Sequence, residues 1–269
     1  MTFMAHAFLL GAVSVGSLFL LMWVIHLVLR NAAIVDVGWG LGFILLCLEY
    51  ILCGQGFNLR NTICFVMILL WGMRIILYLL KRLVTEKEED KRYQKIRRNF
   101  GRMAWLKFLF IFEFQAALEM IIGLPLMIVS FNPNPGLSYV EIFGIFLFVM
   151  SLIAETIADQ QLFAFKNNVL NKGKTCEVGL WRYSRHPNYF FEWLVWVGFF
   201  VYAVSSPMGW VAIVSPMLMF YLLMYVSGIP MAEEQSMMSR GDEYRKYQAK
   251  TSVFFPMPVK QLTLKGHHD

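Results

Sequence analysis

Long apolar runs separated by short polar stretches recur along most of this chain. A helix that crosses a bilayer needs about 20 consecutive apolar residues, and seven runs come close to that length. They cover residues 5–29, 34–53, 62–80, 105–130, 137–163, 187–204 and 209–229. The pattern predicts an all-α, polytopic membrane protein, with seven transmembrane helices in one integral domain over residues 1–269.

The composition agrees with a membrane protein and suggests no metal site. The chain is 58% apolar and 16% charged, with a mean hydropathy of +0.56, which is far from the average of soluble proteins. Its cysteines, Cys47, Cys53, Cys64 and Cys176, lack the spacing of metal ligands. No Cys/His cluster of the zinc type is present, so we expect no bound metal.

Lysine and arginine are distributed unevenly, and this predicts the orientation. Residues 81–107 hold ten of them and residues 166–185 five more, whereas 131–139 and 205–208 hold none. Because cytoplasmic loops carry the Lys/Arg excess, we expect the basic loops and the C-terminus in the cytoplasm and the N-terminus outside a bacterial inner membrane or its equivalent. The net charge of +6 then reflects this topology and contact with anionic lipid. We expect a monomer with lipid partners and no nucleic acid.

The most informative polar stretch covers residues 179–192, GLWRYSRHPNYFFE. Arg182 and Arg185 can meet phosphates at the membrane edge, because arginine binds phosphate through a planar fork of donors. Asn188 and Glu192 are four residues apart and share one face of the helix that follows. A carboxylate inside a membrane helix marks a functional site by default. The structural alternative, a positive-inside anchor with a helix cap, requires neither Asn188 nor Glu192.

Other polar residues interrupt the apolar runs. Singly, each is compatible with a structural ion pair. Together they predict a polar cavity between helices that opens toward the cytoplasm, because unpaired buried polar groups are costly. They are Asp36, Arg74, Glu113, Gln115, Glu119, Glu155, Asp159 and Glu192.

The segment after the last apolar run is charged and amphipathic. One interpretation is a helix that lies on the membrane surface. The other is a lid in which Arg240, Tyr244 and Arg245 close over a bound polyanion.

Three motifs resemble those of the steroid 5-alpha-reductase-like (DUF1295) family. They are LWRYSRHPNYFxE at 180–192, ExxxDQQxxxF at 155–165 and YxxYxxxTxxFxP at 244–256. Asp36-x-x-Trp-Gly40 and Arg74 also resemble the family's N-terminal positions. The resemblance implies a seven-helix membrane reductase that binds NADPH. It would transfer hydride to the β-carbon of an α,β-unsaturated ketone, typically a 3-oxo-4-ene steroid.

The resemblance also implies a cofactor site among the last three helices and the cytoplasmic loops. Asn188 and Glu192 match the residues that hold the nicotinamide end, and Asp159 matches an acidic cofactor contact. Lys166 stands at a basic position, and Arg185 lies in the loop that faces the phosphates. The full expected set is Glu155, Asp159, Lys166, Arg182, Tyr183, Arg185, His186, Asn188, Tyr189, Glu192, Arg240, Tyr244 and Arg245.

The substrate is expected on the side formed by residues 1–130, and the cofactor on the side formed by 131–269. The expected catalytic residues are Asp36, Arg74 and Glu192. Asp36, kept protonated by burial, would donate to the substrate carbonyl. The expected lining residues are Trp39, Trp71, Gln115 and Glu119. The chain lacks the Gln-Glu pair and the Leu/Met-Pro-Ser run with which eukaryotic steroid 5-alpha-reductases meet that carbonyl.

Two other functions are compatible with parts of the pattern. The motif Arg185-His-Pro-x-Tyr189, with Glu233-Glu234, also resembles isoprenylcysteine and phospholipid methyltransferases, which bind S-adenosylmethionine. The spacing of Asn188 and Glu192 favours the reductase. A seven-helix transporter or receptor would not require a basic cluster opposite buried carboxylates, and no pair of broken helices is evident.

Overall fold

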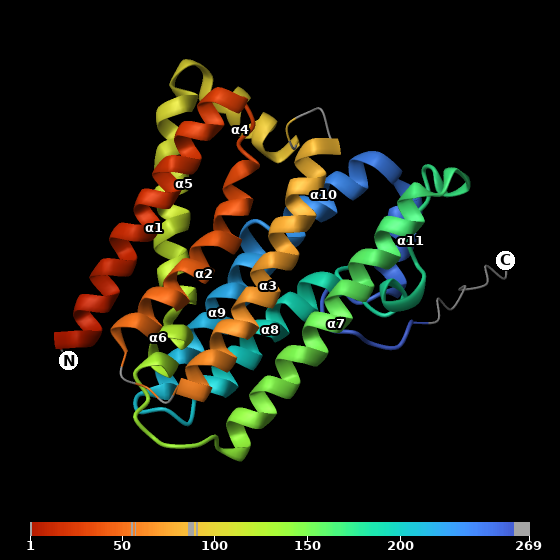
Figure 1. Cartoon of the computed structure of the whole chain (residues 1–269). Helices are drawn as coiled ribbons and strands as arrows, with labels where there is room; N and C mark the ends of the chain where they lie inside the picture. Colours follow the sequence, from red (N-terminus) through yellow and green to blue (C-terminus); the bar gives the residue numbers. More distant parts are fainter. Residues whose placement is uncertain (1, 55, 57, 86–88, 90, 261–269) are drawn as a thin grey trace, which may run out of the picture. The chain divides into compact units, whose positions relative to one another are not determined.

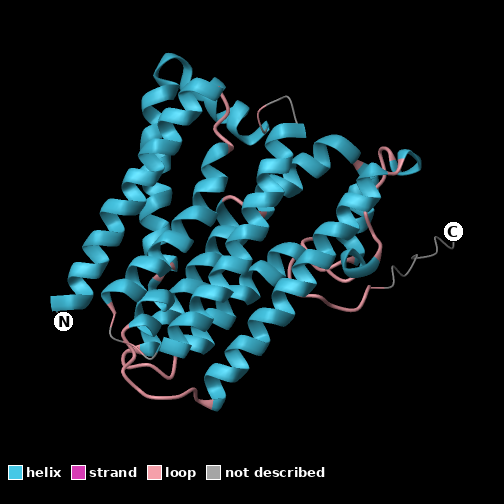
Figure 2. Ribbon diagram, in the orientation of Figure 1, coloured by secondary structure: helices cyan, strands magenta, loops and turns pink. Residues whose placement is uncertain are grey.

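The computed structural model describes residues 2–54, 56, 58–85, 89 and 91–260, and these fold as α-helices joined by turns (Figures 1 and 2). No β-strand occurs in this part of the chain. The helices are α1 (Thr2–Leu29), α2 (Ile34–Cys53), α3 (Asn58–Thr85), α4 (Lys91–Phe100), α5 (Ala104–Ile122), α6 (Leu124–Ser130), α7 (Tyr139–Asn167), α8 (Pro187–Ala203), α9 (Val214–Tyr221), α10 (Ile229–Arg240) and α11 (Asp242–Lys250). The all-α prediction is confirmed.

Five described helices are long and apolar enough to cross a membrane, by length and composition. They are Phe3–Leu29, Ile34–Cys53, Asn58–Leu80, Tyr139–Asn167 and Gly209–Arg240. A sixth crossing is possible where Tyr93–Ile122 and Leu124–Ser130 join at a 43° bend. The predicted span 187–204 folds as α8, whose 17 residues are fewer than the 20 or so that a crossing usually needs. The predicted count of seven is therefore not confirmed.

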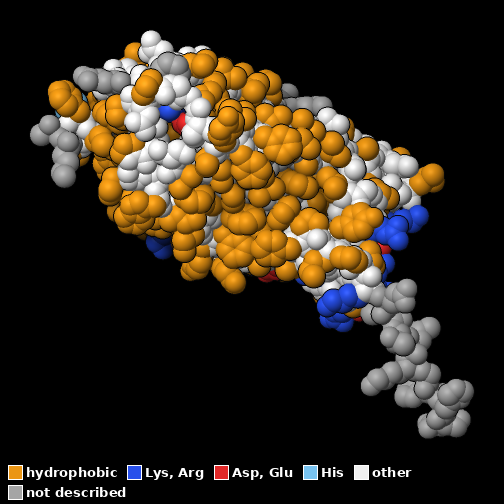
Figure 3. Space-filling view, turned by 90° about the horizontal axis from the view of Figure 1, so that it is seen from below, with side chains coloured by type: hydrophobic (Ala, Val, Ile, Leu, Met, Phe, Trp, Pro, Cys, Tyr) orange, Lys and Arg blue, Asp and Glu red, His pale blue; other side chains and the backbone are white. Residues whose placement is uncertain are grey.

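Exposed apolar side chains cover these helices, as in a multi-pass membrane protein. Leu9 and Val13 of α1 are 64% and 68% exposed, and Phe110 and Phe114 of α5 are 68% and 63% exposed. Figure 3 shows a face on which hydrophobic side chains make up most of the visible surface. Surfaces of this kind are rare on soluble monomers. They identify the chain as a multi-pass membrane protein, while the predicted orientation of its ends stays a prediction.

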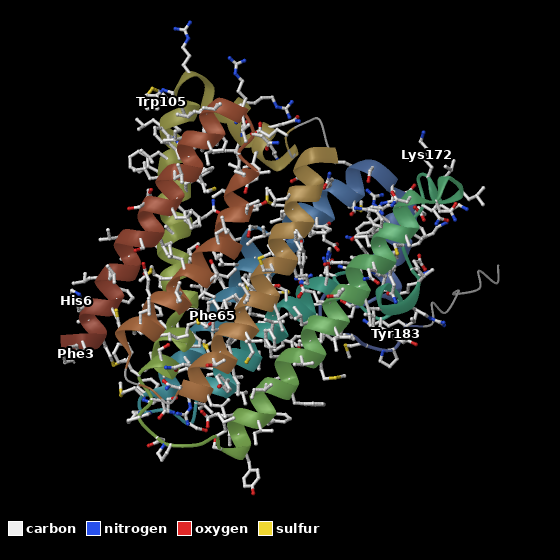
Figure 4. The ribbon with its side chains drawn as sticks, viewed as in Figure 1. Phe3, His6, Phe65, Trp105, Lys172 and Tyr183 are labelled. Carbon is white, nitrogen blue, oxygen red and sulfur yellow. The ribbon has the colours of Figure 1, made fainter. Side chains whose placement is uncertain are left out.

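The chain divides into two compact units. The first comprises Met1–Ile145 and Gly198–Pro216, and the second comprises Phe146–Val197 and Met217–Asp269. In the first unit, α1 lies beside α2 and α5, and Trp105 at the start of α5 lies at the end of the α1–α5 pair opposite to Phe3 (Figures 1 and 4). The two helices therefore run antiparallel.

Glycines allow the helices of the first unit to approach closely. A Cβ atom added at Gly40 of α2 would lie 3.0 Å from the carbonyl oxygen of Gly72 in α3. A Cβ atom at Gly72 would lie 2.9 Å from the carbonyl oxygen of Gly40. The separation at Gly72 is shorter than real Cβ atoms show, and the one at Gly40 is tighter than most of their contacts, so this close helix crossing favours glycine at both positions.

A buried ion pair closes one end of the first unit. Arg60 Nε lies 2.5 Å from Glu141 Oε1, and the two side chains are 2% and 1% exposed. Arg60 also donates to the backbone oxygens of Asn134, at 2.7 Å, and Gly136, at 2.5 Å. Tyr202 donates its hydroxyl to the backbone oxygen of Arg60. These bonds fix the turn between α6 and α7 against α3.

In the second unit, the turn before α8 is anchored on α7. Trp181 Nε1 donates to the backbone oxygen of Ala158 at 2.9 Å, and the backbone N–H of Leu180 donates to Gln161 Oε1 at 2.9 Å. Gly179 adopts φ +56°, and a Cβ atom there would overlap the Gln161 side chain. Glycine therefore satisfies both the backbone and the packing requirement of this turn.

Candidate functional site

Polar residues from α7 and α8 face one another in the second unit. Asn188 Nδ2 of α8 donates to Asp159 Oδ1 of α7 at 3.3 Å. Glu155, 5% exposed, lies one turn before Asp159. Glu192 lies one turn after Asn188 and accepts a bond from Trp196 Nε1 at 3.0 Å. We call these four residues the acidic seam. The structure brings together Asp159 and Asn188, both of which the family resemblance assigns to one cofactor site.

The amide oxygen of Asn188 is a potential ligand contact within the acidic seam. Asn188 Oδ1 is buried and accepts no hydrogen bond from the described part of the chain. Leaving a buried acceptor unpaired costs about 1–3 kcal/mol, and native proteins keep few such groups. The atom is therefore suited to a ligand that donates an N–H or O–H.

A second group of residues converges on one carboxylate. Glu233 of α10 accepts bonds from Arg185 Nε at 2.9 Å and His186 Nε2 at 2.8 Å. Tyr244 Oη and Gln248 Nε2 of α11 also donate to it, at 2.7 and 2.5 Å. We call these five residues the Glu233 cluster. It ties the loop before α8 to both tail helices.

Arg185 uses all three of its nitrogens within the protein. Besides Glu233, it donates to the backbone oxygens of Gln248, at 3.2 Å, and Thr251, at 2.8 Å. The predicted role of Arg185 was a phosphate contact. Its geometry instead favours a positioning role, because every nitrogen of the fork already has an acceptor.

His186 and Tyr244 also belong to the interior of the cluster. His186 is 5% exposed and Tyr244 is 3% exposed. Burial lowers the pKa of His186, and its bond to Glu233 opposes this shift. Burial, together with the Glu233 carboxylate, raises the pKa of Tyr244. Neither side chain is open to a polyanion in the manner predicted for the loop and the lid.

Replacing Arg185 with alanine is expected to lower the free energy of unfolding by about 1.5–3 kcal/mol, the worth of a hydrogen bond to a charged group. The reason is that Glu233 loses its arginine partner. Thermal unfolding in detergent measures this change, and Arg182→Ala, a neighbouring exposed arginine, is the matched control. Unchanged stability with weakened cofactor binding would restore Arg185 as a phosphate ligand.

The remaining predicted cofactor residues lie nearer the surface of the second unit. Lys166, Arg182 and Arg245 are exposed. Tyr183 is 45% exposed and lies at the periphery of this unit (Figure 4). Tyr189 is half-buried and stacks on His186, with 5.5 Å between ring centroids.

Arg240 is half-buried, and its guanidinium group lies 5.1 Å from the centre of the Tyr244 ring. Its Nη2 donates to Ser236 Oγ at 2.6 Å, whereas its buried Nε has no hydrogen-bond partner among the described residues. Among the two tail arginines that the sequence analysis selected, Arg240 therefore has an N–H group, at Nε, that can donate to a ligand.

The predicted substrate-side residues all belong to the first unit. Asp36 Oδ1 accepts a bond from the hydroxyl of Tyr93 in α4, at 2.8 Å. Trp39 Nε1 donates to Gln115 Oε1 at 2.8 Å.

Two further members of this set lie on α3. Trp71 is 2% exposed and meets Phe43 edge to face. Arg74 is half-buried. The expected catalytic set is thus divided between the units, with Asp36 and Arg74 in the first and Glu192 in the second.

Glu233, Gln248 and Gln161 are the important polar residues that sequence reasoning did not place in the site. A signal for Glu233 was present, because it opens the charged segment one turn after the apolar run ends. Gln161 lies in the ExxxDQQ motif. Its hydrogen bond with the backbone of Leu180 forms only in the folded protein, and no pattern in the neighbouring sequence predicts it.

These observations define a class, a helical multi-pass membrane protein with a half-buried polar seam between two helices. The chain belongs to the DUF1295 family, described as a protein of unknown function, which it matches over residues 22–251. It is similar to Uncharacterized protein C594.04c of Schizosaccharomyces pombe, with 24% identity over 263 residues that cover 87% of this chain and 75% of the yeast protein. No solved structure matches the chain. The predicted family is confirmed.

Proposed function

We propose that this protein is an NADPH-dependent reductase of the carbon–carbon double bond in a lipidic α,β-unsaturated ketone, in the manner of steroid 5-alpha-reductases. The observation that carries the proposal is the acidic seam with its unpartnered Asn188 Oδ1. A buried acceptor flanked by carboxylates suits a ligand that presents an amide NH₂ and sugar hydroxyls. The family resemblance of the motifs at 155–165 and 180–192 supports the same ligand.

The residues of the second unit fit such a cofactor. Asn188 and Glu192 would hold the carboxamide, and Asp159 would accept from a hydroxyl group. Lys166, Arg182 and Arg240 would neutralise the phosphates. When bound, NADPH supplies the hydride, and the protein supplies orientation and electrostatics. Arg185 contributes indirectly, because the Glu233 cluster holds the loop that carries these contacts.

The substrate needs a donor where negative charge develops on its carbonyl oxygen. One candidate for this donor is Asp36. The Tyr93 hydroxyl, 2.8 Å from Asp36 Oδ1, fixes the orientation of the carboxyl group. A 3-oxo-4-ene steroid is the substrate that the resemblance favours.

A second candidate is a membrane methyltransferase that uses S-adenosylmethionine. The specific observation in its favour is the pair of carboxylates, Glu155 and Asp159, on one face of α7, because carboxylates suit the ammonium group of that ligand. S-adenosylmethionine carries no phosphate, however. It leaves the basic residues around the seam without a role.

NADPH is expected to raise the melting temperature of the purified protein in detergent, whereas S-adenosylmethionine is not. A ligand that binds only the folded state stabilises it by about 2.7 kcal/mol at 100 times its Kd. Differential scanning fluorimetry with both ligands makes the comparison, and NADH tests the need for the 2′-phosphate. Stabilisation by S-adenosylmethionine alone would replace the reductase with the methyltransferase.

A further inference from the structure

Glu119 is a fully buried carboxyl group in the first unit. Its side chain is 0% exposed, and neither of its oxygens has a hydrogen-bond partner among the described residues. It lies 15 residues after Ala104, the first residue of α5, which places it about 22 Å along the helix axis. An acidic side chain at that depth of an apolar helix is expensive and marks a functional site by default.

The facing helix provides space for this carboxyl group. A Cβ atom added at Gly42 of α2 would lie only 2.7 Å from the carboxyl carbon of Glu119. Any residue other than glycine would expel the carboxyl group from its position. Phe43 and Leu46 of α2, which are next to Gly42 and one turn after it, are 0% exposed.

One turn away, a pair of polar side chains joins the same two helices. Trp39 Nε1 donates to Gln115 Oε1 at 2.8 Å, and both side chains are only half-buried. Gln115 precedes Glu119 by four residues, and Trp39 precedes Gly42 by three, so both pairs share the same helix faces. The polar residues on these two helix faces therefore run from the half-buried Trp39–Gln115 pair to the fully buried Glu119.

Glu119 has no hydrogen-bond partner among the described residues, and this favours its uncharged form. An ionised carboxylate without a partner in an apolar environment costs far more than its neutral form. The uncharged carboxylic acid has one O–H donor and an acceptor oxygen. Neither group has a partner in the part of the chain that the structure describes.

We propose that Glu119 binds the oxygen atom of a lipidic ligand, as the polar end of an otherwise apolar subsite between α2 and α5. The uncharged acid donates its O–H to a ketone oxygen, which makes Glu119, in place of Asp36, the donor to the substrate carbonyl. The Trp39–Gln115 pair forms the entrance that the ligand opens. The assignment of an enone as ligand rests on the proposed reductase function, whereas the hydrogen bond itself does not.

The test compares two lipids that differ only in the oxygen. Cholest-4-en-3-one and oxygen-free cholest-4-ene are added to the purified full-length protein, and a long-chain enone with its matching alkene forms a second pair. The enone of at least one pair is expected to raise the melting temperature of the wild type more than its hydrocarbon does. In Glu119→Leu this difference should vanish, with enone binding weakened about tenfold. Glu113→Gln, on the same helix, should retain the difference.

Two further readouts keep the test decisive. Glu119→Leu should keep or raise the ligand-free melting temperature, because an unpaired polar group has been removed. If this variant does not fold, dicyclohexylcarbodiimide is used on the wild type. This apolar reagent adds across a protonated carboxyl group to give an N-acylurea, and the enone should protect Glu119 from it while the hydrocarbon does not.

Equal responses to both members of each pair, or an unchanged difference in Glu119→Leu, would overturn the subsite. An oxygen-dependent response without stabilisation by NADPH would retain the subsite and reject the reductase. The two proposals therefore fail separately.

Discussion

Replacing Glu141 with alanine is expected to lower the free energy of unfolding by about 3–5 kcal/mol, the usual cost of removing one partner from a buried ion pair. Arg60 and Glu141 are 2% and 1% exposed, so the remaining arginine would keep a charge without its counter-charge. Ser138 would also lose the acceptor of its backbone N–H, which lies 2.7 Å from Glu141 Oε2. Unfolding in a denaturing detergent series measures the effect.

A double variant separates the ion pair from general damage to the turn. Arg60→Met with Glu141→Leu removes both charges and is expected to recover much of the lost stability, because no charge is left buried. Asp242→Ala is the matched control, since its pair with Arg245 is largely exposed and such pairs contribute little. If the double variant is less stable than Glu141→Ala, the carbonyl contacts of Arg60 dominate and the ion pair is secondary.

Replacing Glu192 with glutamine is expected to reduce NADPH-dependent turnover by about 100-fold, the scale on which a small misplacement of reactants acts. The melting temperature should stay near that of the wild type. Glutamine has the same shape and keeps an oxygen that accepts the bond from Trp196 Nε1. It also introduces two donors, which oppose rather than accept the donors of a carboxamide.

Turnover per folded molecule and melting temperature are measured on the same preparation. Asp242→Asn, an acid-to-amide change at an exposed position of the same unit, should alter neither. If the melting temperature falls while turnover per folded molecule is unchanged, Glu192 has a structural role and no catalytic one.

The helices were predictable wherever an apolar run ends sharply at polar residues. The run 34–53 coincides with α2 to the residue, because turn residues flank it on both sides. The run 105–130 was predicted as one span, yet the chain bends by 43° between α5 and α6. Gly123 and Pro125 caused the break, because proline cannot donate within a helix and favours its first turn. The length of an apolar run does not by itself predict where a helix bends.

The site was predictable in its residues and less so in their partners. Asn188 and Asp159 were expected to contribute to one site, and a hydrogen bond joins them. Arg185 carries a phosphate-binding chemistry, and nothing local reveals that a carboxylate 48 positions later occupies its donors. Glu119 was recognisable as an intramembrane acid, but the glycine that receives it lies on another helix. Partner identity is a tertiary property that periodicity does not encode.

The Glu233 cluster has a consequence for biosynthesis. Ribosomes deliver Arg185 and His186 well before Glu233, Tyr244 and Gln248, because the carboxylate follows Arg185 by 48 positions. A nascent chain that ends before α10 exposes an arginine fork with no acid to receive it. The loop before α8 therefore reaches its final arrangement only when the last two helices have been translated, so this part of the second unit is completed at the end of synthesis.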